Sequence, residues 1–180
     1  MIKLKARNLH WLEQCPEFDT CVHGSVYLEI DGHVISDGEE DDWTVSGSAL
    51  LFLRSIDQGH KPSEQGPQLI PHCAMPSFVD NGEMLWFGCG VGIDWQIDIK
   101  DDRAVHSFED GSILETNISE WRETVVRFAN QILEFIESEP ERQFVESAAE
   151  DDKPAFEVYC TELRSLINKH EPSLSSPSSL

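Results

Sequence analysis

Residues 25–30 (SVYLEI) alternate between hydrophobic and polar side chains, as a half-buried β-strand does. Asp31-Gly32 follows directly and favours a tight turn. Residues 33–36 then return with a short apolar centre. This pattern predicts a β-hairpin near the N-terminus.

A second alternating stretch, residues 92–100 (GIDWQIDIK), is the most regular in the chain. Its large apolar side chains fall on one face, and Asp94, Gln96 and Asp98 fall on the other. A strand with one buried and one wet face is typical of an antiparallel sheet. With three neighbouring short strands it predicts a four-strand meander over residues 84–89, 92–99, 104–108 and 112–117.

Three other segments repeat their apolar residues at steps of three and four, which predicts amphipathic helices. Ser and Asn residues precede two of them as candidate caps, and Gly or Pro residues mark the helix ends. The expected boundaries are Ser46 or Ser48 to Gly59, Asn117 to before Pro140, and Pro154 to Ile167.

Strands and helices are therefore segregated along the chain, without βαβ alternation. This order predicts an α+β fold. An antiparallel sheet, formed by the N-terminal hairpin and the four-strand meander, would be packed on one face by two or three helices. We expect one domain over residues 1–170, followed by a low-complexity tail over residues 171–180.

The charge of the chain narrows the choice of partners. It has 34 acidic and 13 basic side chains, a formal net charge of −21 at pH 7. A surface of this sign repels phosphate groups, which argues against nucleic acid and anionic membranes, and it attracts a basic protein. The alternative is that the acidity serves only solubility.

The cysteines and the apolar runs indicate a compartment. Five cysteines are an odd number and sparse for 180 residues, unlike a secreted disulfide framework. No apolar run approaches the ~18 residues of a membrane span. We expect a cytoplasmic protein.

The cysteines and two of the histidines are candidates either for a metal site or for simple packing. The candidate ligands lie in two groups, and no pair among them has the short spacing of a zinc knuckle. Free cysteine often serves as a small buried filler. We therefore predict packing, with no metal and no cofactor, for Cys15, Cys21, His23, His72, Cys73 and Cys89.

The glycines of GCGVG (residues 88–92) do not fit a phosphate-binding loop, because a strand rather than a helix follows them. Gly88, Gly90 and Gly92 are expected to mark a bulge or a close approach of another backbone.

One catalytic arrangement remains open. If the turn after Lys100 has three residues, Val105 lies opposite Ile99, and His106 lies opposite Asp98 as a potential general base. An ordinary surface His–Asp pair is the alternative.

Four segments carry a resemblance to known proteins, and they are WTVSGSALLFLRSIDQGH (43–60), QLIPHC (68–73), GCGVGIDWQI (88–97) and WRETVVRFANQILEFIESEP (121–140). Together they resemble a pattern of small acidic bacterial proteins, some of which are regarded as immunity proteins of polymorphic toxin or contact-dependent inhibition systems. The resemblance implies a cytoplasmic protein that blocks one cognate toxin domain by binding it, without catalysis. It carries over no catalytic residue.

The sequence is compatible with three hypotheses about the function. The first is a non-catalytic acidic interaction protein, an immunity protein that neutralises a basic toxin. The second is a small hydrolase or transferase that uses His106 or His72 with nearby acids, and the third is a metal-binding regulatory protein. For the first, the predicted partner-binding residues are Asp94, Gln96 and Asp98 together with the acidic loop residues Glu39, Glu40, Asp41 and Asp42.

Overall fold

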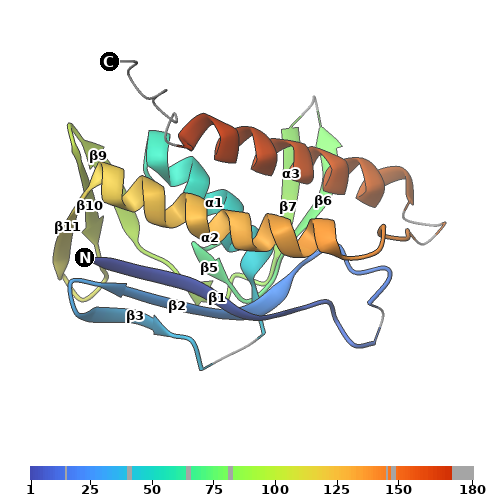
Figure 1. Ribbon diagram of the computed structural model, residues 1–180, viewed down its shortest axis with the longest axis horizontal. Helices are drawn as coiled ribbons and strands as arrows, with labels where there is room; N and C mark the ends of the chain where they lie inside the picture. The colour runs from blue at the N-terminus through green and yellow to red at the C-terminus, as the bar shows by residue number, and fades with distance from the viewer. Residues whose placement is uncertain are drawn as a thin grey trace, which may run out of the picture.

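A computed structural model describes residues 1–14, 16–39, 42–63, 66–80, 83–144, 146 and 149–171. Its central element is helix α1 (Val45–Gln58), which contacts α2 (Ile118–Ser138), α3 (Ala149–His170) and strands of three different sheets. Figure 1 shows α2 and α3 running side by side over α1, with the strands arranged around them.

Helix α1 can occupy this position because its first turns carry small residues. Every residue from Val45 to Leu53 is buried. Small side chains allow neighbouring elements to approach closely, and two hydrogen bonds join polar groups of α1 to the other two helices. Tyr159 donates a hydrogen bond to the Ser46 carbonyl at 3.1 Å, and the Trp121 indole donates to Ser55 Oγ at 3.1 Å.

The N-terminal sheet contains β1 (Ile2–His10), β2 (His23–Ile30), β3 (His33–Asp37) and β4 (Trp43–Thr44). Strand β2 pairs antiparallel with the other three. Helix α2 lies against β1 (Figure 1). The Asp31-Gly32 turn has positive φ at both residues, as the predicted tight hairpin turn requires.

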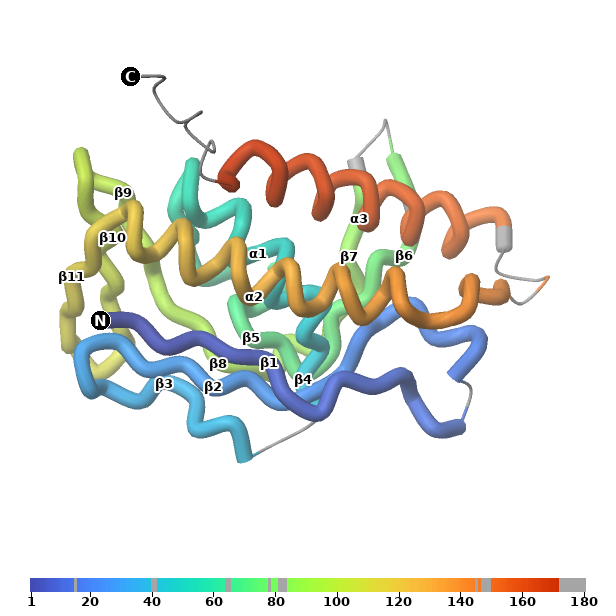
Figure 2. Tube along the Cα trace, in the orientation of Figure 1, coloured from blue at the N-terminus to red at the C-terminus, as the bar shows by residue number. Residues whose placement is uncertain are grey.

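Three further antiparallel sheets surround α1. β9 (Gln96–Lys100), β10 (Arg103–Ser107) and β11 (Ile113–Asn117) form a meander. The other two sheets are pairs, and Figure 2 shows the chain paths. β5 (Ile70–Pro71) pairs with β8 (Gly92–Ile93), and β6 (Ala74–Asp80) pairs with β7 (Glu83–Gly88), which α3 covers.

The predicted α+β class with antiparallel sheets is confirmed. The predicted four-strand meander is wrong in its strand order, because β7 pairs with β6 rather than with the strand that follows. The predicted strand over residues 92–99 is also interrupted. It divides into β8 and β9 at Asp94-Trp95, and its two halves pair with different partners.

The helix boundaries follow the sequence closely at two places. Asn117 caps α2, where its side chain accepts a hydrogen bond from the Ser119 N–H at 2.8 Å, and Gly59 follows α1 with φ of 68°. Two expectations are wrong. Thr44, not Ser46 or Ser48, precedes α1, and α3 begins at Ala149, so Pro154 lies within the helix rather than opening it.

The buried apolar residues form one cluster that joins all three helices to the strands. Among the described helices, none is long and apolar enough to cross a membrane. Residues 172–180 of the predicted tail lie outside the described residues.

Replacing Gly92 with alanine will destabilise the protein by about 1–3 kcal/mol, the usual cost of forcing extra atoms into a filled site. An added Cβ would lie 2.5 Å from the Ile70 carbonyl oxygen, where the β5 and β8 backbones meet. Urea unfolding will measure the loss. Gly66→Ala is the control, because its Cβ would meet the Ser63 Cβ at an ordinary 3.4 Å, and an equal loss in both variants would contradict the argument.

Candidate functional site

His106 is a core residue and not a general base on the wet face. The turn after β9 contains only Asp101 and Asp102, so Val105 lies opposite Asp98 and His106 lies opposite Ile97. The predicted His106–Asp98 pairing is therefore wrong by one residue, and a shift of one residue moves a side chain to the other face of the sheet.

The His106 ring is fully buried and hydrogen-bonded on both nitrogens. Trp95 donates its indole N–H to His106 Nδ1 at 3.1 Å, and Nε2 lies 3.2 Å from Thr116 Oγ1. Nδ1 is therefore the acceptor, and Nε2 carries the proton. Burial lowers the pKa of His106 to about 4. The residue is a neutral structural histidine at pH 7.

Asp94 is more enclosed than the strand pattern predicted. Its Oδ1 lies 2.7 Å from His60 Nε2 and accepts a hydrogen bond from the Leu69 backbone N–H at 3.1 Å. The backbone of His60 also pairs with Ile97 in both directions at 2.8 Å. Asp94, which lies between β8 and β9, is thus hydrogen-bonded to two residues of the segment that follows α1.

Asp94 and Gln96 line the same open hollow, which has a volume of about 800 Å³. Gln96 also donates a hydrogen bond to Asp98 Oδ2 at 2.8 Å, so Asp98 lies next to the lining of the hollow without being part of it. The turn between β10 and β11 contributes Phe108 and Glu109. The complete lining is Pro62, Ser63, Gln68, Gly90, Asp94, Trp95, Gln96, Ser107, Phe108 and Glu109.

This hollow combines aromatic and acidic groups. Phe108 stacks on Trp95 with ring centroids 5.8 Å apart, and Glu109 is exposed beside it. Carboxylates and aromatic faces are the groups that attract Arg and Lys side chains. The hollow is therefore suited to receive a cationic side chain from outside. We call the space lined by Asp94, Trp95, Gln96, Phe108 and Glu109 the acidic hollow, and Asp98 lies at its edge through the bond with Gln96.

Part of the predicted acidic loop lies near β8. Glu39 and Asp42 are exposed, and Glu39 shares a shallow hollow with Trp43 and with Ile93, the residue before Asp94. Glu40 and Asp41 lie outside the described residues. The fold thus brings the described part of the loop close to the chain segment that forms the acidic hollow.

The cysteines divide into two kinds. Cys21 and Cys160 are buried, as expected for packing residues, and Cys15 lies outside the described residues. Cys89 is exposed, which contradicts a packing role, and it lies beside Cys73 and His72. Hydrogen bonding with the Cys73 thiol lowers the pKa of Cys89 to about 7, and burial raises the pKa of Cys73.

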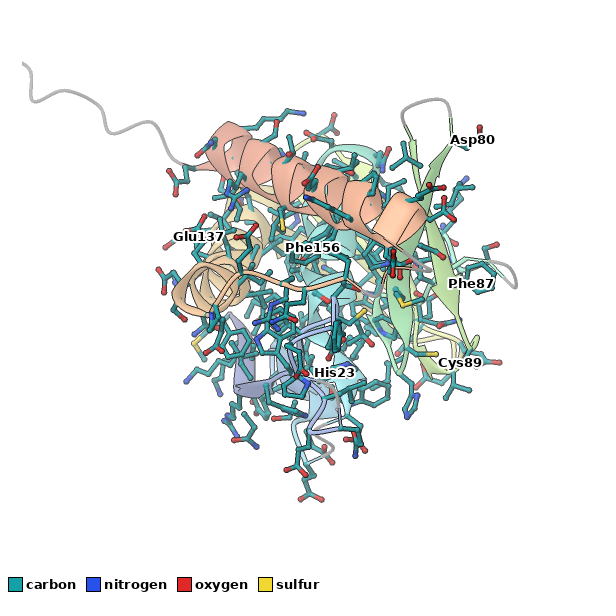
Figure 3. The ribbon with its side chains drawn as sticks, turned by 90° about the vertical axis from the view of Figure 1, so that its right-hand side faces the viewer. His23, Asp80, Phe87, Cys89, Glu137 and Phe156 are labelled. Carbon is teal, nitrogen blue, oxygen red and sulfur yellow. The ribbon has the colours of Figure 1, made fainter. Side chains whose placement is uncertain are left out.

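The hairpin that leads to Cys89 has an exposed apolar face. Met75 and Phe87 are opposite each other on β6 and β7, and Leu85 lies two residues before Phe87. These side chains are 40%, 63% and 38% exposed, and Val91 beyond Cys89 is 59% exposed. Figure 3 shows Phe87 and Cys89 on the outer side of the hairpin, with Asp80 at its other end.

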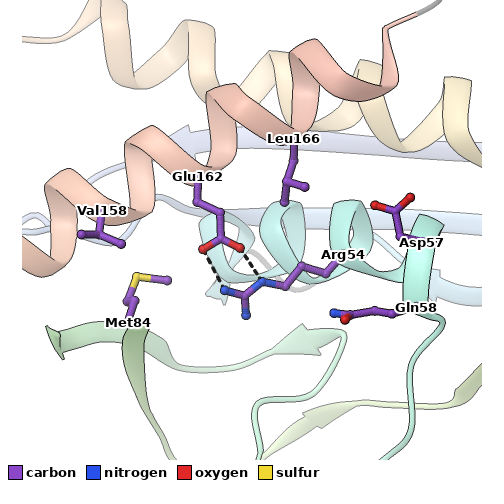
Figure 4. Close-up of a pocket in the computed structure, with 7 residues that line it drawn as sticks. All are labelled: Arg54, Asp57, Gln58, Met84, Val158, Glu162 and Leu166. Atoms are coloured by element: carbon purple, nitrogen blue, oxygen red, sulfur yellow. Dashed lines mark hydrogen bonds and ion pairs between the residues drawn. The ribbon is translucent and has the colours of Figure 1, made fainter. Parts of the chain in front are cut away.

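A hollow between α1 and α3 contains an ion pair that joins the two helices. Arg54 forms two parallel hydrogen bonds with Glu162, at 2.7 and 2.8 Å (Figure 4). Met84, Val158 and Leu166 supply apolar lining around this pair. The two formal charges neutralise each other, so this hollow offers no surplus charge to a ligand at its centre.

Sequence patterns overlooked Glu109 and Phe108 as members of the acidic hollow, and treated His72, Cys73 and Cys89 as packing residues. Their signals were weak, because each set is assembled by pairings between distant segments. A search of family models, of curated proteins and of solved structures found no match to this chain.

Proposed function

We propose that the protein is a non-catalytic acidic binding protein that captures a basic protein domain and receives its Arg or Lys side chains at the acidic hollow. In the form closest to the sequence pattern, it is a bacterial cytoplasmic immunity protein, and its partner is a cognate toxin. The observation that carries the proposal is the acidic hollow itself, where Asp94, Glu109 and the Phe108–Trp95 stack line one open space.

The distribution of the cations supports this proposal. All 13 Lys and Arg side chains lie in the described residues, and seven of them form ion pairs with carboxylates of the described part of the chain. The surplus carboxylates therefore set the charge of the surface. The paired cations are Lys3, Arg54, Arg103, Arg127, Lys153, Arg164 and Lys169.

Such a surface favours fast association more than a long-lived complex. Electrostatic complementarity raises the rate of encounter with a basic domain and repels acidic competitors. Dissolved salt screens this attraction over about 8 Å at physiological ionic strength. Binding should therefore weaken steeply as salt is added.

The first experiment that tests this proposal identifies the partner. The tagged chain is immobilised and exposed to lysate of its own cell at low salt, and bound proteins are identified by mass spectrometry. We expect one basic protein in near-equal amount, released by added salt and able to bind again after purification. If the purified candidates bind equally well at high salt, or if they are acidic, the proposal is wrong.

Charge reversal will then test the position of the interface. Asp98→Lys with Glu109→Lys should slow association with the purified partner by about tenfold or more, measured by stopped-flow fluorescence at low salt. Asp94 is left intact, because its bonds to His60 and Leu69 hold the fold.

The matched control is Glu13→Lys with Glu134→Lys, which changes the net charge by the same amount at two exposed positions. Glu134 lies on α2 toward the end away from β9, β10 and β11 (Figure 1). We expect this control to slow association much less than the hollow variant. Equal slowing would show that only total charge matters, and it would contradict the placement of the interface at the acidic hollow.

A further inference from the structure

His72, Cys73 and Cys89 bring one imidazole and two thiols together at the surface. Their candidate ligand atoms all lie within 4.8 Å of one another, and His72 Nδ1 lies 3.8 Å from Cys89 Sγ. Nitrogen and sulfur ligands bound at ~2.0–2.3 Å to a tetrahedral zinc ion lie about 3.6–3.8 Å apart. The cluster therefore needs a contraction of only about 1 Å at its widest point to reach this geometry.

The hairpin register holds the two thiols together. Ala74 pairs with Gly88 at the end of β6 and β7, so Cys73 and Cys89 are the next two residues on the facing chains. The Cys89 backbone N–H donates to Cys73 Sγ at 2.9 Å. A Cβ on Gly88 would lie 2.8 Å from the Cys73 carbonyl oxygen, so the two chains can meet here only at a glycine.

Both backbone polar groups of His72, its N–H and its carbonyl, are hydrogen-bonded. Its N–H donates to the Val91 carbonyl at 2.9 Å, and its carbonyl accepts from the Thr44 hydroxyl at 3.0 Å. Gly90 has φ of 70° and turns the chain between Cys89 and Val91. The three candidate ligands are thus preorganised by backbone contacts before any ion binds.

We propose that His72, Cys73 and Cys89 form a zinc-binding site with three protein ligands and a fourth position open to water or an external ligand. Two sulfurs and one imidazole suit Zn²⁺, whereas Mg²⁺ and Ca²⁺ prefer oxygen. Cys89 is exposed, which leaves the fourth side accessible. On binding, both thiols lose their protons to the buffer and no oxidation occurs. This site is independent of the proposed capture of a basic protein.

Metal titration of the full chain, reduced and kept free of oxygen, tests the proposal. Calorimetry with Zn²⁺ in the presence of excess Mg²⁺ should give one site per chain, because Mg²⁺ occupies the surface carboxylates. Co²⁺ as a probe should give the visible absorption of a tetrahedral, thiolate-bound ion. The melting temperature should rise with Zn²⁺, since the ion ties residues 72–73 to Cys89 in the folded state only.

Each ligand variant, His72→Asn, Cys73→Ser and Cys89→Ser, should weaken Zn²⁺ affinity at least about a hundredfold, because even the loss of an outer contact costs 10- to 100-fold. The matched controls are His33→Asn, an exposed histidine on β3, and Cys160→Ala, a buried cysteine on α3. Both should bind like the parent chain. Circular dichroism confirms that every variant is folded, so loss of binding is not loss of structure.

Several outcomes would overturn the proposal. Binding without thiolate absorption from Co²⁺ would mean carboxylate ligands, and full affinity in the Cys89→Ser variant would mean another site. A reduced chain that binds no Zn²⁺, but forms a Cys73–Cys89 disulfide in air, would make the pair a redox couple instead.

Discussion

Replacing Phe52 with alanine will lower the free energy of unfolding by about 3–5 kcal/mol, the range expected for deletion of a buried aromatic ring. Phe52 is fully buried on α1 and lies at the centre of an aromatic group. Its ring centroid is 6.0 Å from that of Trp95, and 5.7 Å from those of Trp121 and Phe128. The variant therefore opens a cavity where α1, α2 and the β8–β9 connection meet.

Urea unfolding followed by tryptophan fluorescence will measure this loss, and Phe87→Ala is the matched control. Phe87 is the same residue type but 63% exposed on β7, so its removal should change stability by less than about 0.5 kcal/mol. Losses of similar size in the two variants would mean that the aromatic group around Phe52 is not the centre of the core.

The second large effect is a loss of stability in acid that originates at His106. Burial lowers the pKa of His106 from 6.5 to about 4 in the folded protein. Between these two pH values the unfolded chain binds a proton at this residue and the folded chain does not. Stability therefore falls as the pH drops through this window, by about 3 kcal/mol in total. The physical cause is burial of the ring, which penalises its charged form.

The contribution of His106 is isolated by comparison with His106→Asn. The variant should be less stable than the parent chain at pH 7, and the gap should narrow by about 3 kcal/mol by pH 4, because only the parent chain has this histidine to protonate. Carboxylates that titrate in the same window affect both proteins and cancel. Parallel curves for the parent chain and His106→Asn would contradict the argument.

Local patterns predicted the helices well, because their periodicity and caps lie within one segment. The apolar repeat between Asn117 and Pro140 is long, and a cap accounts for the start of α2. The predicted caps of α1 are wrong because Ser46 and Ser48 lie within its first turns, where every residue is buried. There the serines make space for neighbouring helices, a role that tertiary packing decides.

The pairing of the strands was less predictable from the amino-acid sequence alone than the helices were. Strand β6 contains Pro76, which argues against a strand, but a bulge between Pro76 and Phe78 accommodates it. With β6 overlooked, β7 was assigned the wrong neighbour. In residues 92–100 the side-chain alternation was real, since Trp95 and Ile97 are buried, but it concealed the break at Asp94-Trp95.

The candidate sites, like the secondary structure, were predictable only where their residues lie close together in the sequence. Asp94, Gln96 and Asp98 were predicted together because they lie on one short segment, and the structure links them. Glu109 joins them only through the β9–β10–β11 meander. Cys73 and Cys89 meet only through the β6–β7 register, which composition and spacing did not reveal.

The small size of the sheets has a consequence for crowding inside a cell. Among the named strands of the described residues, only β2 and β10 pair with a strand on each side. The other strands have no second strand partner, although His60 pairs with the outer edge of β9 at Ile97. Unpaired strand edges are where copies of a protein join into aggregates. Mutual repulsion between chains of charge −21 keeps those edges apart. Carboxylates far from any partner therefore act as spacers between molecules, which limits how many of them a variant can replace before the protein loses its solubility.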